Sequence, residues 1–187
     1  EGAGPALLKR INRLKELFEI LRSEWNGPVS IKMRLGKNEK EKKNKIYLKV
    51  LNKAEEAGLD WITIHPKTVA EKSIEPVDLT ALKECVESTS IPILGNGFII
   101  DEESADNMLK TGVKGLMIAR AAIGDPFIFN RIKHYLETGK RLNLPNKQDY
   151  EGALNKYLEI ANKFNIPKYY IDYHKRIFEL KINNKWD

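Results

Sequence analysis

Residues 61–97 read WITIHPKTVAEKSIEPVDLTALKECVESTSIPILGNG and contain the unit that decides the fold. Two short apolar runs, WITIH at 61–65 and IPIL at 91–94, flank a segment at 79–88 whose apolar residues recur at helical spacing. Parallel neighbours in a sheet need a crossover connection, which is usually a helix. This stretch therefore predicts one strand–helix–strand unit of a parallel sheet.

The same alternation continues outward from this unit in both directions. Further strands are expected at 29–35 and 115–118, and helices are expected at 5–24, 46–57, 101–111 and 127–137. The charged run at 37–45 is typical of a solvated loop. Because the strands are mostly apolar and alternate with amphipathic helices, we expect an α/β fold whose parallel sheet is buried on both faces.

The pattern changes after residue 148. Apolar and aromatic residues then recur at helical spacing on both sides of Pro167, and no further strand is indicated. We expect residues 1–139 to form the α/β domain and residues 140–187 to form a small all-helical domain, with the linker at 140–148.

The charge of the 187 residues is concentrated toward the end of the chain. The whole sequence has 32 basic and 26 acidic side chains, whereas residues 130–187 have 12 and 7, together with nine of the 16 aromatic residues. A mixture of basic and aromatic side chains is typical of surfaces that bind phosphates and stack bases. The alternative is a helical bundle with a tyrosine-rich core and a solvated lysine surface.

Several function classes are disfavoured by composition. No apolar run reaches the roughly 18 residues of a membrane span, and no signal peptide precedes the first charged helix. The single cysteine, Cys85, excludes an internal disulfide, and no Cys/His cluster has zinc spacing. We therefore expect a cytoplasmic protein without a metal site, in which Cys85 is a core residue of the helix at 79–88.

Polar residues occupy equivalent positions at or just past the ends of the four predicted strands, namely Lys32, His65, Asn96 and Arg120. Their separations of 33, 31 and 24 residues each correspond to one strand–helix unit. The carboxyl ends of parallel strands meet at one mouth, so these four side chains predict a site there. Arg34 alternates with Lys32 on the same strand and is expected to face that mouth as well.

The types of these residues favour a phosphorylated, planar cofactor such as flavin mononucleotide (FMN). Asn96 beside Gly97 offers an amide where backbone can approach closely. Arg120, followed by two alanines and Gly124, is typical of a phosphate-binding turn, although a plain strand-to-helix turn with a salt bridge is the alternative. For His65, a general acid, a hydrogen-bond donor to flavin and a core histidine all stay open.

Five stretches resemble the tRNA-dihydrouridine synthases in order and spacing: EGAGPALLK (1–9), VSIKMRLG (29–36), ITIHPKT (62–68), IPILGNGFI (91–99) and GLMIARAAIGDPFIF (115–129). The resemblance covers residues 1–139 well and the remainder loosely. It implies the C-terminal half of a (β/α)8 TIM-type barrel that binds FMN, about four βα units, followed by a helical domain that binds tRNA. The implied reaction reduces the C5–C6 double bond of uridine in tRNA, with NADPH as the reductant.

The resemblance also implies roles for individual residues. Six residues would bind the cofactor. Lys32 and His65 would lie at the flavin ring or ribityl chain, and Asn96 and Gly97 would lie near the ribityl–phosphate portion. Ala119 and Arg120 would hold the phosphate. Arg34 and Lys67 match basic positions of the mouth that meet flavin or RNA.

Three positions depart from the family pattern. The family usually has His-Gly-Arg-Thr where this chain has His-Pro-Lys-Thr at 65–68, and Lys67 keeps the charge but lacks the planar fork of arginine. Phe98 replaces a common aspartate, and Ala119 replaces a common glycine.

The resemblance places the family's proton-donating cysteine upstream of Glu1, before the match to Gly2-Ala3-Gly4, so no catalytic residue is expected within this chain. We expect residues 1–187 to be the C-terminal portion of a larger protein and not to complete the reaction alone. Two alternatives stay open: another FMN-dependent barrel oxidoreductase, such as a dihydroorotate-dehydrogenase-like enzyme, and a non-catalytic RNA-binding fragment.

Overall fold

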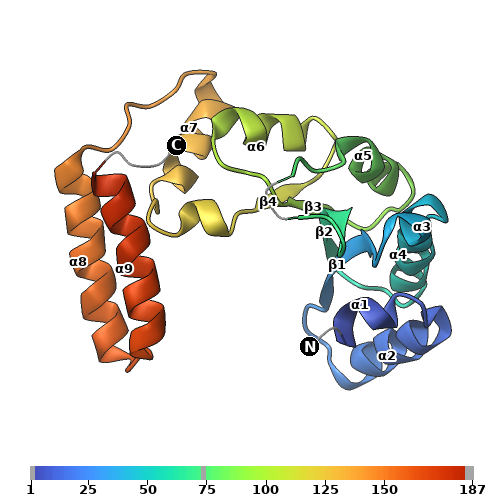
Figure 1. The fold of residues 1–187 in the computed structure, drawn as a ribbon. Coiled ribbons are helices and arrows are strands. Elements are labelled where there is room, and N and C mark those ends of the chain that lie inside the picture. Colours follow the sequence, from blue (N-terminus) through green and yellow to red (C-terminus); the bar gives the residue numbers. More distant parts are fainter. Residues whose placement is uncertain (1–2, 73–74, 184–187) are drawn as a thin grey trace. The chain divides into compact units, whose positions relative to one another are not determined.

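The computed structural model describes residues 3–72 and 75–183 (Figure 1). Glu1 and Gly2, with which the first of the five resembling stretches begins, lie outside the described residues.

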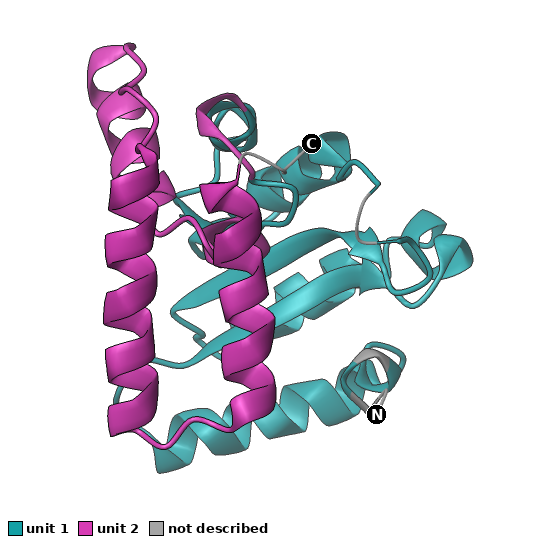
Figure 2. Cartoon of the chain, turned by 60° about the vertical axis from the view of Figure 1, so that its left-hand side comes forward, with its two compact units in different colours: residues 1–99, 104–117 teal, residues 100–103, 118–187 magenta. Residues whose placement is uncertain are grey.

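The chain forms two compact units, the first made of residues 1–99 and 104–117 and the second of residues 100–103 and 118–187 (Figure 2). A four-stranded sheet lies in the first unit, with the strands β1 (Ser30–Gly36), β2 (Trp61–Thr68), β3 (Ile93–Asn96) and β4 (Gly115–Met117). All four strands of the sequence prediction are therefore present.

Helices alternate with these strands. Those that precede or connect them are α1 (Ala3–Leu7), α2 (Ile11–Glu24), α3 (Glu39–Lys43), α4 (Ile46–Glu56), α5 (Leu79–Glu87) and α6 (Glu102–Leu109). After β4 follow the short 3-10 helix η1 (Arg120–Ala122) and the helices α7 (Ile128–Thr138), α8 (Lys147–Lys163) and α9 (Lys168–Ile182). The predicted α/β class, with C-terminal helices, is confirmed.

The strands run parallel in the order β1-β2-β3-β4, so each strand lies beside the next one in the sequence. A doubly wound sheet would contain a reversal of strand order, and the described sheet has none. The sequential order is consistent with part of a TIM barrel.

The two faces of the sheet differ in polarity because side chains alternate along each strand. One face is apolar and includes Met33, Ile62 and Ile64, which are all buried, and α4 and α5 pack against the strands. The other face, called the polar face below, includes the exposed Ser30 and Lys32. The expectation that the sheet is buried on both faces was therefore wrong for β1.

Helices α4 and α5 illustrate how the sequence sets local structure. In α4 the buried residues Tyr47, Val50, Leu51 and Ala54 follow helical spacing. Helix α5 begins at Asp78, whose carboxylate accepts a hydrogen bond from the Ala81 N–H at 2.9 Å. Cys85 is fully buried in α5, which confirms its interpretation as a core residue.

Two predicted elements differ from the structure. The helix expected at 5–24 is split into α1 and α2 by a turn in which the Arg10 N–H donates to the Leu7 carbonyl at 2.8 Å. The loop expected at 37–45 contains the short helix α3, because the Asn38 side chain accepts from the Glu41 N–H at 3.1 Å and caps it.

The second unit is built from α7, α8 and α9. Helix α8 begins with a capping box between Asn146 and Asp149. Tyr157 of α8 stacks on Phe178 of α9 with ring centroids 6.1 Å apart, and Phe127 meets Tyr150 edge-on at 5.6 Å. Compactness thus groups α7 with the two following helices, and the domain boundary expected at residues 140–148 stays a prediction.

Candidate functional site

The polar face brings several of the predicted residues of the first unit into one row. Strand pairing places Arg34 opposite His65 and Ile64 opposite Gly95, so that His65 lies beside Asn96. Neighbouring strands are about 4.8 Å apart, and residues in register point to the same side of a parallel sheet. Arg34, His65 and Asn96 therefore follow one another across three strands near their carboxyl ends.

Lys32 lies on the same face, one row nearer the amino ends of the strands, opposite Thr63. The pKa of Lys32 is lowered, first by partial burial and second by the charge of Arg34. Two cations two residues apart on one strand repel each other, and an anionic or electron-accepting ligand relieves that repulsion.

Gly97 lets the backbone pass directly against the imidazole of His65. Its φ is +99°, and a Cβ at this position would lie 2.4 Å from both Cδ2 and Nε2 of the His65 ring. Only glycine fits this approach without a shift of the ring or the backbone. The Asn96–Gly97 segment thus lies directly against the ring of His65.

Asn96 has a structural partner that the sequence did not reveal. The side chain is 6% exposed, and its Nδ2 donates to the Met117 carbonyl at 2.7 Å. This bond adds a side-chain contact to the backbone pairing between the ends of β3 and β4.

Arg34 and Lys67 hold the segment that follows β2. The Arg34 Nη1 donates to the Thr68 carbonyl at 2.8 Å, and the Lys67 Nζ donates to the Lys72 carbonyl. Lys67 is only 1% exposed, which opposes direct contact with RNA in this arrangement. The predicted substrate roles of both residues stay predictions.

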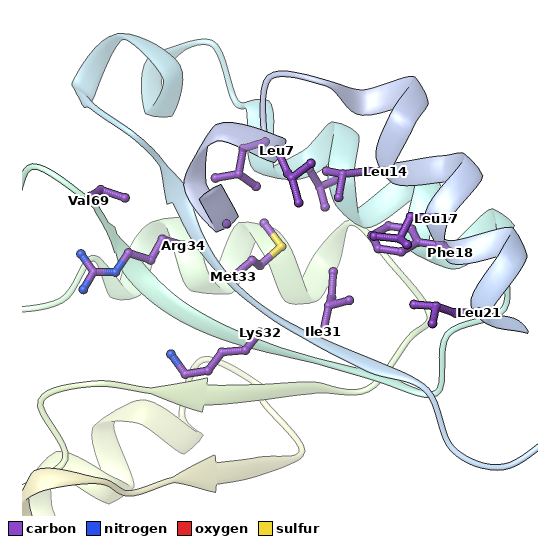
Figure 3. A pocket seen from close by; sticks show the side chains of 13 residues that line it. Leu7, Leu14, Leu17, Phe18, Leu21, Ile31, Lys32, Met33, Arg34 and Val69 are labelled. Atoms are coloured by element: carbon purple, nitrogen blue, oxygen red, sulfur yellow. The ribbon is translucent and has the colours of Figure 1, made fainter. Parts of the chain in front are cut away.

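The first unit also contains an apolar cavity of about 420 Å³ along β1 (Figure 3). Its lining includes Leu14, Phe18 and Met33, and Lys32 extends on the opposite side of β1 from Ile31 and Met33 (Figure 3). His65 and Asn96 are not among its lining residues. Arg34 and Lys32 do line it, so the cavity meets the row of polar residues only at β1.

Ala119 and Arg120 belong to the second unit, where they begin η1. The Ala122 N–H donates to the Ala119 carbonyl at 3.0 Å, and the Ile123 N–H donates to the Arg120 carbonyl at 3.1 Å. Gly124 follows with φ +79°. Because the other predicted residues lie in the first unit, the single mouth expected for all six cofactor residues stays a prediction.

The donor set fits FMN in its chemistry. The polar face offers two cations, an imidazole and a glycine without the Cβ that would collide with that imidazole, and the Arg120 segment offers a guanidinium among small residues. Among the described residues, no group of three or more His, Cys, Asp or Glu side chains is arranged to hold a metal ion. None of the described helices is long and apolar enough to cross a membrane.

The sequence interpretation missed a buried ionic cluster that follows η1. Asp125 and Arg131 form it together with Glu102, and all three side chains are buried. The available signal was Arg131 itself, because it shares one helical stripe with the buried residues Ile128 and Ile132.

Comparison with known proteins decides the family. The family model described as "Dihydrouridine synthase (Dus)" matches residues 1–184. The chain belongs to the dihydrouridine synthase family. This result confirms the resemblance drawn from the five sequence stretches and does not favour a dihydroorotate-dehydrogenase-like protein.

Individual relatives agree. The chain is 34% identical over 165 residues to tRNA-dihydrouridine synthase B of Pseudomonas putida, with 88% of this chain and 48% of the relative covered. It is 37% identical over 141 residues to tRNA-dihydrouridine synthase B of Klebsiella pneumoniae, with 75% and 43% covered. It is 31% identical over 134 residues to a Xenopus tropicalis protein named tRNA-dihydrouridine(47) synthase, NAD(P)(+)-like, with 71% and 20% covered. The chain spans about half the length of these bacterial relatives.

The contact between Gly97 and His65 gives a first prediction. Gly97→Ala forces the His65 ring or the backbone to move. Gly58→Ala is the control: the φ of Gly58 is +72°, and the atom nearest to the new Cβ, Cδ of Arg22, is 4.0 Å away, so this change adds only backbone strain. Both changes are expected to cost about 1–2 kcal/mol of unfolding free energy from the left-handed backbone, measured by urea denaturation. Only Gly97→Ala is expected to shift the NMR resonances of the His65 ring, and an unchanged His65 spectrum would refute the contact.

The row of cations gives a second prediction. Arg34→Gln removes the smaller of the two causes that lower the pKa of Lys32, so this pKa is expected to rise part of the way toward its ordinary value. An NMR titration of the Lys32 Cε resonance measures it. The control is Arg22→Gln, which removes an arginine that pairs with Asp60 and leaves the pKa of Lys32 unchanged. Equal values in wild type and Arg34→Gln would show that Arg34 does not act on Lys32.

Proposed function

We propose that the natural protein containing this chain is a cytoplasmic tRNA-dihydrouridine synthase, which reduces the C5–C6 double bond of specific uridines in tRNA with FMN as cofactor and NADPH as hydride source. The observation that carries the proposal is the row of Arg34, His65 and Asn96 on the polar face of a chain that matches the family over residues 1–184. The names of the bacterial relatives support the substrate, and the NAD(P)(+) in the name of the Xenopus protein supports the reductant.

In this proposal the four βα units are the C-terminal half of a (β/α)8 barrel, and the polar face is the barrel interior. The sequential strand order supports this assignment, since every strand of such a barrel lies beside the next. Catalytic groups of these barrels lie at the carboxyl ends of the strands, which is where Arg34, His65 and Asn96 lie.

FMN, when bound, supplies the redox chemistry that passes hydride from NADPH to the uridine ring. Lys32 and His65 would lie at its ring or ribityl chain, where the cation stabilises negative charge. Asn96 and Gly97 would lie near the ribityl–phosphate portion, and the bond from Asn96 to Met117 would keep Gly97 seated against His65.

The phosphate would be held by Ala119 and Arg120. A guanidinium donates to phosphate oxygens in a planar, two-pronged geometry, which makes arginine the stronger anchor of the two. Ala119 would contribute only backbone, because its side chain is a single methyl group.

Cys85 does not serve as the proton donor of this reaction. It is fully buried in α5, and burial raises the pKa of its thiol to about 12. The resemblance places the family's cysteine upstream of Glu1, and this position stays a prediction. The proposed reaction therefore requires the longer protein.

The second unit would contact the tRNA. Tyr169, Tyr170 and Tyr173 of α9 are 76%, 53% and 49% exposed, whereas Tyr150 of α8 is buried. Of the two alternatives that the sequence left open, the three exposed rings favour the aromatic surface over a tyrosine-rich core. The exposed rings offer stacking surfaces for unpaired bases beside the basic side chains of the same unit.

The cofactor proposal is tested on the natural protein by its flavin absorbance and by FMN titration of the apo form. Arg120→Ala is expected to raise the Kd for FMN roughly ten- to a hundredfold, because a charge-assisted bond to the phosphate is lost. The control Arg141→Ala removes an exposed arginine paired with Glu103 and leaves the affinity unchanged. A protein without flavin that still binds tRNA would instead support the non-catalytic RNA-binding alternative.

The tRNA proposal is tested by mobility shift at several salt concentrations. Binding is expected to weaken steeply as salt rises, because phosphate contacts release counterions. The double change Tyr169→Ala with Tyr173→Ala is expected to weaken binding at least about fivefold through lost stacking. Leu144→Ala, which removes a side chain that is 75% exposed in the same unit, serves as the control. Equal affinity of wild type and the tyrosine variant would remove α9 from the RNA surface.

A further inference from the structure

The buried ionic cluster of the second unit lies directly after the segment that would hold the phosphate. Nε of Arg131 is 3.0 Å from Oε1 of Glu102, and its Nη1 is 3.1 and 3.0 Å from the two carboxylate oxygens of Asp125. The exposed fractions of Arg131, Glu102 and Asp125 are 6%, 5% and 3%. Charges this deeply buried persist only where they are paired and held in good geometry.

This pairing fixes one end of the segment from Ala119 to Gly124. Asp125 immediately follows Gly124, and its carboxylate is held by two contacts to a single nitrogen of α7. The backbone at Asp125 therefore has little freedom. The position of the Asp125 backbone therefore restrains the residues of the preceding segment that would contact a ligand.

Helix α9 restrains the same segment from another side. A Cβ at Gly124 would lie 2.8 Å from Cγ2 of Ile177 and 3.2 Å from the backbone carbon of Ile177 and the backbone nitrogen of Phe178. The segment and α9 are thus in direct backbone contact at a residue with φ +79°.

Helix α8 reaches the cluster through Tyr150. Its ring meets Phe127 edge-on at 5.6 Å and is 8% exposed. The pKa of Tyr150 is raised, first by burial and second by the negative charge of Asp125, while the charge of Arg131 opposes the rise. The phenol of α8 thus lies close enough to the carboxylate of Asp125 to feel its charge, and the guanidinium of α7 holds that carboxylate directly.

We propose that Arg131 and Tyr150 are positioning residues that act through Asp125 to hold the 119–124 segment in the shape that binds the phosphate of the cofactor. The inference rests on the proposed function, because it requires that this segment binds a phosphate. It assigns the C-terminal helices a second role besides RNA contact. The helices α8 and α9 set the affinity for the phosphate group, while the rest of the flavin is bound elsewhere.

The test compares FMN with riboflavin, which lacks the phosphate, by quenching of flavin fluorescence in the apo form of the natural protein. Tyr150→Phe keeps the ring against Phe127 and removes the hydroxyl beside Asp125. It is expected to raise the Kd for FMN roughly three- to tenfold and to leave the Kd for riboflavin unchanged, so that the preference for FMN falls. Arg131→Lys, which keeps the charge and loses the fork, is expected to reduce that preference as well.

Tyr157→Phe is the matched control. It also removes a phenol of α8, whose oxygen lies 2.7 Å from Nδ1 of His174. The preference for FMN over riboflavin is expected to stay at its wild-type value in this variant. Arg120→Ala supplies the reference for a protein in which the phosphate contact itself is lost.

The outcomes separate the inference from the proposed function. If wild type binds neither FMN nor riboflavin, or binds both equally well, the proposed phosphate site is wrong and the inference falls with it. If wild type prefers FMN and Tyr150→Phe leaves this preference unchanged, the proposed function stands and the positioning role is refuted. An equal rise of both Kd values also refutes it, because a general loss of stability affects the two ligands alike.

Discussion

The parallel register of the four strands is the constraint on which the candidate site depends. Because β1, β2 and β3 pair in step, alternate residues of all three strands point to the same side, and a shift by one residue would send each polar side chain into the helix-covered face. The buried residues Met33, Ile62 and Ile64 make such a shift costly. The apolar packing under α4 and α5 thus determines where Arg34, His65 and Asn96 lie, although none of these three residues takes part in it.

The sequence predicted the fold through spacing. Strand-to-strand separations and the apolar runs predicted all four strands, and helical spacing predicted α4 and α5 close to their observed ends. It failed where a local hydrogen bond competed with periodicity. The Arg10 turn divides what reads as one helix, and the Asn38 cap orders a run of charges that reads as a loop. Burial of the sheet on both faces was wrong for β1, since the apolar content of a strand does not reveal that Ser30 and Lys32 are exposed.

The candidate site was predictable in its location and less so in its details. The carboxyl ends of neighbouring parallel strands lie together, which is why His65 and Asn96 were identifiable from position. Lys32 was predicted to be equivalent to His65, but it lies opposite Thr63, one row nearer the amino ends of the strands, and Arg34 takes the place opposite His65. The partners of those groups depend on distant carbonyls, such as Met117 for Asn96 and Lys72 for Lys67, and no local pattern encodes them. The same holds for Arg131, whose partners Asp125 and Glu102 lie six and 29 residues away.

The two edge strands of the described sheet are what the proposed half-barrel would leave unpaired. The described sheet ends at β1 on one side and at β4 on the other, whereas a closed barrel has no edge strands. Beside β1 lies the apolar cavity of about 420 Å³, and Leu17 and Leu21 of its lining are both 41% exposed. Apolar surface along an edge strand favours association with a further strand. A barrel completed by four more βα units would cover this surface and close the polar face into an interior, which links the exposure of Lys32 in this chain to its proposed position beside the flavin.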